Sequence, residues 1–181
     1  VLPRIAHMQY DRYSNQIYKF VADDWGNSKG RIMASPADSE NISYKVVQEF
    51  PDVLPDRLYG LSLCRQNNYY LDLRNKEIVV TDKQFAESDR IPLPAQIKES
   101  KNLIKKVWVS PCEKYCFINM MKHYDTDESK EESMPLSFLF DLDTMELVQD
   151  FDYDYVSDFT MIDEGRKFLL ATWQGTYMGE V

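Results

Sequence analysis

The sequence predicts an all-β protein made of repeated units of four short antiparallel strands, and two observations carry this prediction. Residues 106–151 contain four runs rich in β-branched and aromatic residues, at 107–110, 115–120, 136–141 and 146–151, separated by polar or turn segments. The first strand of this unit begins at Val107, and similar segments begin at Ile5, Tyr59 and Ser157. This spacing of about 50 residues indicates a repeat architecture.

The neighbouring units supply the remaining strands. We expect units at 4–50, 57–93, 106–151 and 157–181 within a single all-β region. The first has strands at 5–8, 16–22, 30–35 and 44–50, and the second at 59–62, 69–73, 77–82 and 90–93. The last has strands at 158–162 and 167–173 and a third from Tyr177, so the chain holds about three and a half units.

Two segments resemble the serine-proline-aspartate-glycine-lysine turn and following apolar strand of WD-repeat-like β-propellers. They are SPCEKYCFI at 110–118 and IDEGRKFLLATWQG at 162–175, and LFDLDTMELVQDF at 139–151 is similar to the third strand, turn and fourth strand of such a blade. The chain departs from the family at Cys112 and Glu113, which replace the usual Asp-Gly, and no Gly-His or Trp-Asp signature closes a blade.

The resemblance implies a β-propeller, with a β-sandwich or barrel as the alternative. Propellers close with about 4 to 8 blades, because an open ring leaves apolar faces and a strand edge bare. We therefore expect these blades to be part of a larger ring, completed by further blades from the parent chain or by a second chain. In the polar segment 87–106, Pro94 favours either a short helical turn at a first helical position or a loop.

Composition excludes several classes of function. A net charge of −9 disfavours nucleic acid, whose binding depends on clustered Lys and Arg, and favours a cationic partner. No apolar run reaches the ~18 to 20 residues of a membrane span, and the start has no signal-peptide pattern, so we expect no membrane association. Three cysteines, an odd number, indicate a reducing compartment and predict a cytoplasmic location.

Neither metal motif in the sequence is complete. Cys112, Cys116 and His123 could supply three zinc ligands, but there is no second close pair, and strand alternation predicts Cys116 as a buried apolar residue. The loop 125–133 begins with the Asp-x-Asp-x-Ser spacing of a calcium loop. It has Lys130 where Gly is required and Leu136 where a bidentate Glu is required. We expect no metal.

The sequence also lacks a recognisable catalytic motif. His7 and His123 lie outside any nucleophile motif, and there is no glycine-rich phosphate loop. We therefore expect no cofactor and no catalysis within this chain.

Aromatic residues divide into two predicted groups. Those in strands are expected to form the core between blades: Trp108, Phe117, Phe138, Phe140, Phe168 and Trp173. Trp25 lies between strands, where it is either an interface anchor or a ring folded over a blade end. Replacing Trp173 with alanine is accordingly predicted to destabilise the fold more than the same change at Trp25.

The acidic residues predict the functional surface. Connections after every second and fourth strand should lie on one face, and they fall at 23–30, 51–57, 92–101, 125–134 and 150–155, with nearly all of the net charge. The candidate interface residues are Trp25, Asp125, Asp127, Glu128, Glu131, Glu132, Asp152 and Asp154.

These observations predict a non-catalytic interaction module that binds a basic protein. Two alternatives are a propeller portion of a larger hydrolase or oxidoreductase that gates or positions substrate, and an acidic inhibitor or immunity-type protein. Acidic loops that serve only solubility are a further interpretation.

Overall fold

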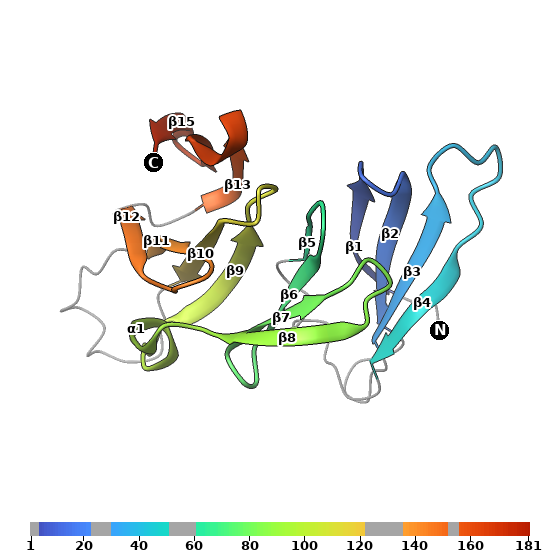
Figure 1. Ribbon diagram of the computed structural model, residues 1–181, viewed down its shortest axis with the longest axis horizontal. Helices are drawn as coiled ribbons and strands as arrows, with labels where there is room; N and C mark the ends of the chain where they lie inside the picture. Colours follow the sequence, from blue (N-terminus) through green and yellow to red (C-terminus); the bar gives the residue numbers. More distant parts are fainter. Residues whose placement is uncertain (1–3, 23–29, 51–60, 122–135, 152–155) are drawn as a thin grey trace.

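The computed structural model describes residues 4–22, 30–50, 61–121, 136–151 and 156–181. These residues form four antiparallel sheets that follow one another in chain order, numbered sheets 1 to 4 below (Figure 1). The fold is nearly all β, as the alternating pattern of the sequence predicted. None of the helical segments that the structure describes has the length and hydrophobicity of a membrane span.

Every sheet pairs its strands in the order in which they occur in the chain. Sheet 1 contains β1 (Arg4–Asp11), β2 (Gln16–Ala22), β3 (Gly30–Pro36) and β4 (Lys45–Phe50). Sheet 2 contains β5 (Ser62–Leu63), β6 (Asn68–Asp72), β7 (Glu77–Thr81) and β8 (Glu87–Pro92). Sheet 3 contains β9 (Leu103–Val109), β10 (Tyr115–Met121), β11 (Ser137–Asp141) and β12 (Leu147–Phe151). Sheet 4 has three strands, β13 (Val156–Ile162), β14 (Lys167–Thr172) and β15 (Gly175–Glu180).

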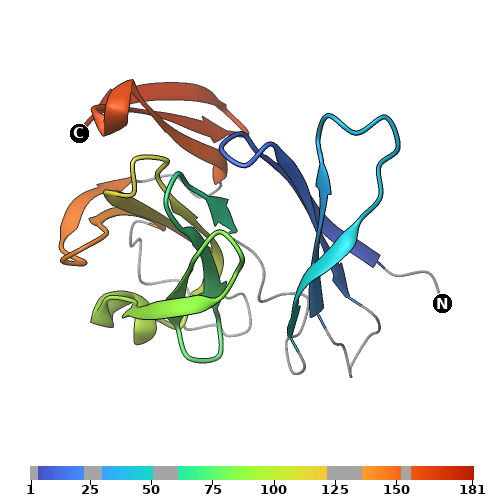
Figure 2. The ribbon, with the colours of Figure 1, turned by 45° about the vertical axis from the view of Figure 1, so that its right-hand side comes forward.

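The sheets are arranged as propeller blades, because the first strands of sheets 2, 3 and 4 contact one another in succession. The amide of Val109 in β9 donates to the hydroxyl of Ser62 in β5 at 2.8 Å. Lys106 of β9 in turn donates to the carbonyl of Ser157 in β13 at 3.1 Å. The later strands of each sheet then extend away from these first strands (Figure 2). The structure thus confirms the propeller and excludes the sandwich and barrel alternatives.

The polar segment after β8 contains the short helical turn that Pro94 suggested. The helix α1 (Ala95–Lys98) follows Pro94, which is its N-cap in extended conformation rather than its first helical residue. Ile97 of α1 is 1% exposed and joins the apolar cluster between sheets 2 and 3.

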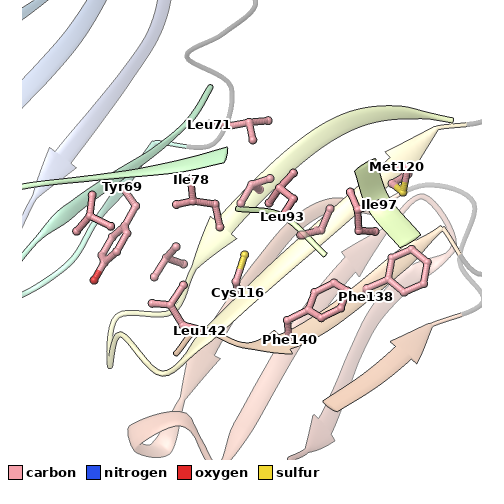
Figure 3. Close-up of a cluster of buried hydrophobic side chains, with 14 of the residues drawn as sticks. Tyr69, Leu71, Ile78, Leu93, Ile97, Cys116, Met120, Phe138, Phe140 and Leu142 are labelled. Carbon is pink, nitrogen blue, oxygen red and sulfur yellow. The ribbon is translucent and has the colours of Figure 1, made fainter. Parts of the chain in front are cut away.

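Three buried clusters hold neighbouring sheets together, and Figure 3 shows the one between sheets 2 and 3. Its members include Tyr69, Leu71, Ile78, Leu93, Ile97, Cys116, Met120, Phe138, Phe140 and Leu142. Sheets 1 and 2 enclose Tyr18, Ile32, Ala34, Leu61 and Phe85. Sheets 3 and 4 enclose Phe117, Leu139, Phe151, Val156, Phe159, Met161, Phe168 and Leu170.

Alternation along β10 explains how one strand serves two of these clusters. Cys116 and Ile118 point toward sheet 2, whereas Phe117 points toward sheet 4 and stacks on Phe159 with ring centroids 4.1 Å apart. Cys116 is fully buried, which confirms its predicted role as a small apolar residue.

Five of the six predicted core aromatics contribute to these clusters. Phe117, Phe138, Phe140 and Phe168 are buried, and Trp108 packs partly buried against the cluster between sheets 3 and 4.

The prediction that Trp173 is a core residue is wrong. Its side chain is 73% exposed, because β14 ends at Thr172 and Trp173 lies in the turn before β15. The hydroxyl of Thr172 fixes this turn by accepting from the amide of Gln174 at 3.1 Å and donating to the carbonyl of Gly175 at 3.2 Å.

Candidate functional site

The two edges at which connections leave the sheets differ in what their residues do. In an antiparallel sheet, the connections after the first and third strands lie at one end of the strands, and those after the second and fourth strands lie at the opposite end. Each of these two sets of strand ends forms one edge of the molecule. We call the first the clamp edge, with turns at 12–15, 37–44, 64–67, 82–86, 110–114, 142–146 and 163–166. The second is the loop edge, whose described connections are 73–76, 93–102 and 173–174. The described strand ends that precede and follow 23–29, 51–60, 122–135 and 152–155 lie at the same edge.

At the clamp edge, an ion pair joins sheets 1 and 2. Asp11 ends β1, and one of its carboxylate oxygens lies 2.8 Å from the Nζ atom of Lys83 in the turn after β7. The carboxylate also accepts from the amide of Tyr13 at 2.9 Å and the hydroxyl of Ser14 at 2.7 Å. All of its charge is thereby compensated, although the side chain is fully buried.

The ammonium of Lys83 binds further oxygens of sheet 2. It donates to the carbonyl of Cys64 at 2.7 Å and to the side-chain oxygen of Asn68 at 2.9 Å. Asn68 is fully buried, and its amide nitrogen donates to the carbonyl of Asp82 at 3.1 Å. The cation is therefore held by three oxygens from both sheets, which fixes the position of sheet 1 relative to sheet 2.

A second clamp joins sheets 2 and 3 through Glu113. Its carboxylate accepts from the phenol of Tyr69 at 2.7 Å, the side-chain amide of Asn67 at 2.9 Å and the backbone amide of Gln66 at 2.7 Å. Glu113 adopts a φ of 58°, in the left-handed region that favours glycine. WD-repeat-like propellers have glycine at this turn position. Here the Glu113 side chain supplies an acceptor for three donors of the neighbouring sheet.

The third clamp is steric and joins sheets 3 and 4. A Cβ atom on Gly165, which has a φ of 88°, would lie 2.8 Å from the sulfur of Cys112 and 3.3 Å from the ring of Tyr115. The turn 163–166 is thus packed directly against the turn 110–114. The three clamps together place the clamp edges of all four sheets on the same side of the molecule.

Protonation states at the clamps follow from burial and partners. Burial alone would raise the pKa of Asp11, but Lys83 and the hydrogen bonds from Ser14 and Tyr13 outweigh it and hold that pKa below its usual value. Burial, followed by the bond to Glu113, raises the pKa of the Tyr69 phenol above its ordinary value. Asp11 is therefore a carboxylate and Tyr69 a neutral donor at neutral pH.

The cysteines lie in different environments. Cys116 is fully buried in β10, whereas Cys112 is partly exposed in the turn after β9, with its sulfur 3.2 Å from the hydroxyl of Ser110. His123, the third residue of the candidate zinc set, lies outside the described residues, as does the candidate calcium loop 125–133. Among the described residues, no group of three or more His, Cys, Asp or Glu could hold a metal ion.

The predicted interface residues lie outside the part of the chain that the structure describes. They are Trp25, Asp125, Asp127, Glu128, Glu131, Glu132, Asp152 and Asp154. The strand ends that flank them are described: Ala22 pairs with Gly30, and Ser137 pairs with both Asn119 and Phe151. These ends belong to the loop edge of sheets 1 and 3.

The sequence did not predict the basic turn 73–76 at the loop edge. It also did not predict the contacts of the three clamps. The turn 73–76 joins β6 to β7 at the loop edge and contributes Arg74 and Lys76. Lys76 donates to the carbonyl of Lys98 and so attaches α1 to this turn. No local signal marks Asp11 or Lys83 as partners, but Glu113 stood out because it occupies the glycine position of a turn.

Comparisons with known proteins show the fold. No protein-family model matches the chain, and no curated protein matches its sequence. TolB from Acinetobacter baumannii is similar in structure with a TM-score of 0.59 at 10% identity, and the match covers 99% of this chain and 41% of TolB. The acylaminoacyl peptidase of Pyrococcus horikoshii gives 0.56 at 12% identity, covering 94% of this chain and 28% of the peptidase.

A WD40 domain is also similar to this chain, in agreement with the resemblance noted in the sequence. The Pan2 WD40 domain from Neurospora crassa matches with a TM-score of 0.50 at 14% identity, over 96% of this chain and 48% of the Pan2 chain. This chain therefore spans less than half the length of each of these three structures. At such identities the likeness establishes a propeller fold.

Proposed function

We propose that this propeller is a non-catalytic interaction module that presents acidic loops at its loop edge to a basic protein. One observation supports this assignment most strongly: the two edges are used differently. The clamp edge places Asp11, Glu113 and Gly165 in contacts between sheets, where they are not available to a partner. Among the connections of the loop edge, those at 122–136 and 152–155 contain seven acidic residues and two lysines, a net charge of −5.

The negative charge of the loop edge is expected to speed its association with a basic partner. Carboxylates gathered on one side focus a negative potential, which raises the rate at which a basic partner is encountered and makes that rate sensitive to salt. Arg74 and Lys76 lie on the same edge and reduce the potential near sheet 2. The strongest potential is therefore expected near sheets 3 and 4, next to the exposed Asp150 at the end of β12.

The proposal is tested with two variants that change the charge equally. One neutralises loop-edge acids: D125N/D127N/E128Q/E131Q/E132Q. The other neutralises exposed acids of the clamp edge: D38N/E40Q/D143N/E146Q/E164Q. A decalysine peptide is the probe, and its association rate is measured by stopped flow over a salt series. We expect the loop-edge variant to lose roughly tenfold in rate at low salt and most of its salt dependence, and the control to change little.

Equal losses in the two variants would mean that only total charge matters, and would contradict the proposal. An association rate that neither variant changes would contradict it as well. A separate pull-down at micromolar protein asks whether a basic protein partner is recovered. Recovery of none would count against an interaction module.

A further inference from the structure

Two connections at the loop edge are positively charged in a chain whose net charge is −9. The turn between β6 and β7 contains Arg74 and Lys76, and the connection from β8 to β9, which includes α1, contains Lys98 and Lys101. These four cations stand against one carboxylate, that of Glu99, so the two connections have a net charge of +3. They belong to sheets 2 and 3, each of which packs against a described sheet on both sides.

Hydrogen bonds hold these two connections together. The ammonium of Lys76 donates to the carbonyl of Lys98, and the carbonyl of Lys76 accepts from the amide of Leu93 at 3.1 Å. Leu93 and Ile97 belong to the buried cluster between sheets 2 and 3, which anchors both ends of α1 (Figure 3). The backbone that bears the four cations is therefore fixed to the body of the molecule.

Three of these cations have no partner in the part of the chain that the structure describes. Arg74 and Lys101 are exposed and Lys98 is half-buried, and within the described residues their side chains make no ion pair or hydrogen bond. Asp72, the acid that precedes the turn, is already paired with Arg90 at 3.0 Å. We call Arg74, Lys98 and Lys101 the basic platform. Its charges are accessible to an anion from outside the chain.

An apolar pair follows the basic platform directly in the chain. β9 begins at Leu103, two residues after Lys101, and Leu103 pairs with Met121 at the end of β10. Their side chains are 47% and 41% exposed, whereas the neighbouring pair of Ile104 and Met120 belongs to or packs against the buried cluster. The surface thus combines cations with accessible apolar side chains.

We propose that the basic platform and the apolar pair bind an acidic segment of a protein partner, one that also contains a large apolar side chain. Carboxylates of the segment pair with Arg74, Lys98 and Lys101, and its apolar side chain covers Leu103 and Met121. Ion pairs at an exposed surface are individually weak, so the contact depends on several charges together with the burial of apolar area. Charge complementarity favours carboxylates over nucleic acid, because the chain as a whole repels a long polyanion.

This inference adds to the proposed function and does not rest on it. The acidic residues proposed to meet a basic protein are other residues of the chain. A partner that meets both surfaces has a basic region and an acidic region, and such a bipolar contact fixes its orientation on the loop edge. The two contacts are tested with probes of opposite charge, so the failure of either is distinguishable from the failure of the other.

Fluorescence anisotropy with two labelled peptides tests the proposal. One peptide has three glutamates on either side of a leucine, and in the other an alanine replaces the leucine. We expect R74Q/K98Q/K101Q to weaken binding of the leucine peptide by about tenfold. The matched control K45Q/R65Q/K114Q removes three exposed cations of the clamp edge and should change the Kd by less than about twofold.

A second pair of changes tests the apolar part of the surface. L103S/M121S should weaken binding of the leucine peptide by about fivefold and leave that of the alanine peptide nearly unchanged, because only the leucine buries apolar area there. R74E/K101E, at the two exposed positions of the basic platform, should abolish binding of both peptides. Circular dichroism of each variant checks that the fold is retained.

Three results would overturn the proposal. The first is equal loss of affinity in R74Q/K98Q/K101Q and in the clamp-edge control, which would mean that only total charge matters. The second is equal affinity for the leucine and alanine peptides, or no binding of either at millimolar concentration. The third is tighter binding of a single-stranded oligonucleotide than of the leucine peptide, which would assign the surface to a different class of partner.

Discussion

The buried carboxylate of Asp11 and the ammonium of Lys83 lie 2.8 Å apart, and the two residues come from different sheets. The ion pair joins sheets 1 and 2, as does the apolar cluster between them. Its partners Asn68, Ser14 and Tyr13 leave neither charge uncompensated. Removal of either residue leaves the charge of the other without its partner. The pair therefore predicts a large loss of stability when one of the two residues is replaced.

Lys83→Met should destabilise the protein by about 3 kcal/mol, at the lower end of the range for breaking a buried pair, since Lys83 is 21% exposed. The variant leaves the Asp11 carboxylate buried without its cation. Urea denaturation measures the change in the free energy of unfolding. D11N/K83M removes the buried charge too and should be more stable than Lys83→Met alone; if it is less stable, the cost does not come from the unpaired carboxylate.

The same pair predicts a pH dependence. The pKa of Asp11 is lowered from 3.8 in the folded state, so its contribution is fully present above that value and is lost as the pH falls through the folded pKa. The difference in stability between the wild type and D11N/K83M should therefore stay constant from pH 7 to about 4 and shrink below. Urea midpoints over this range check it, and a difference that shrinks already at pH 6 would contradict it.

Glu113 combines a favourable clamp with an unfavourable backbone conformation. Glu113→Ala removes the acceptor of three donors but keeps a side chain at φ 58°, whereas Glu113→Gly removes the acceptor and relieves the backbone. Both should destabilise the protein, and alanine should cost about 1 kcal/mol more than glycine. Thermal or urea unfolding measures both. A glycine variant as stable as the wild type would show that the carboxylate contributes nothing.

Trp173 and Phe117 should differ widely in their tolerance of truncation. Trp173 is 73% exposed in a turn, so Trp173→Ala should change the free energy of unfolding by no more than about 0.5 kcal/mol. Phe117 is fully buried against Phe159, and Phe117→Ala should cost about 3 to 5 kcal/mol. Denaturant midpoints in the reverse order would contradict the placement of the two side chains.

Gly179 should not tolerate a methyl group. A Cβ atom there would meet the Phe168 ring at 2.2 Å, so Gly179→Ala should cost about 1 to 3 kcal/mol. Phe168→Leu shortens the opposing side chain, and G179A should cost less in that background than in the wild type. The measurement is a double-mutant cycle by urea denaturation, and strictly additive effects would rule out the contact.

The sequence was sufficient to predict the order of the strands and the bounds of some of them, although β8 (Glu87–Pro92) and β9 (Leu103–Val109) begin earlier than the predicted 90–93 and 107–110. In β2, for example, residues 16–22 agree with the observed Gln16–Ala22, because a run of aromatic and β-branched residues lies between two polar segments. The two faces of β10 follow from the alternation of side chains along a strand. Trp173 shows where this reasoning fails, since the apolar run from Phe168 continues past the end of the strand and only Gly175 marks the turn.

The candidate site was less accessible to sequence reasoning. The separation between Asp11 and Lys83 is set by how two sheets pack, and no periodicity along either segment encodes it. The acidic residues of the loop edge could be assigned to one side from topology alone, because strand order fixes the side on which a connection leaves. The number and charge of these acidic residues follow from the sequence. The prediction omitted the basic turn with Arg74 and Lys76, because that connection was not included in the set assigned to this side.

The three buried clusters, each shared by one pair of consecutive sheets, have a consequence for how the protein folds. In such an array each sheet packs against the sheets next to it in the chain, and the free energy of folding is close to a sum over neighbouring interfaces. Among the described sheets, sheets 2 and 3 each share buried clusters with two other sheets, whereas sheets 1 and 4 each share one. Native-state hydrogen exchange should therefore find the slowest amides in β7 and β10, with protection declining toward both termini.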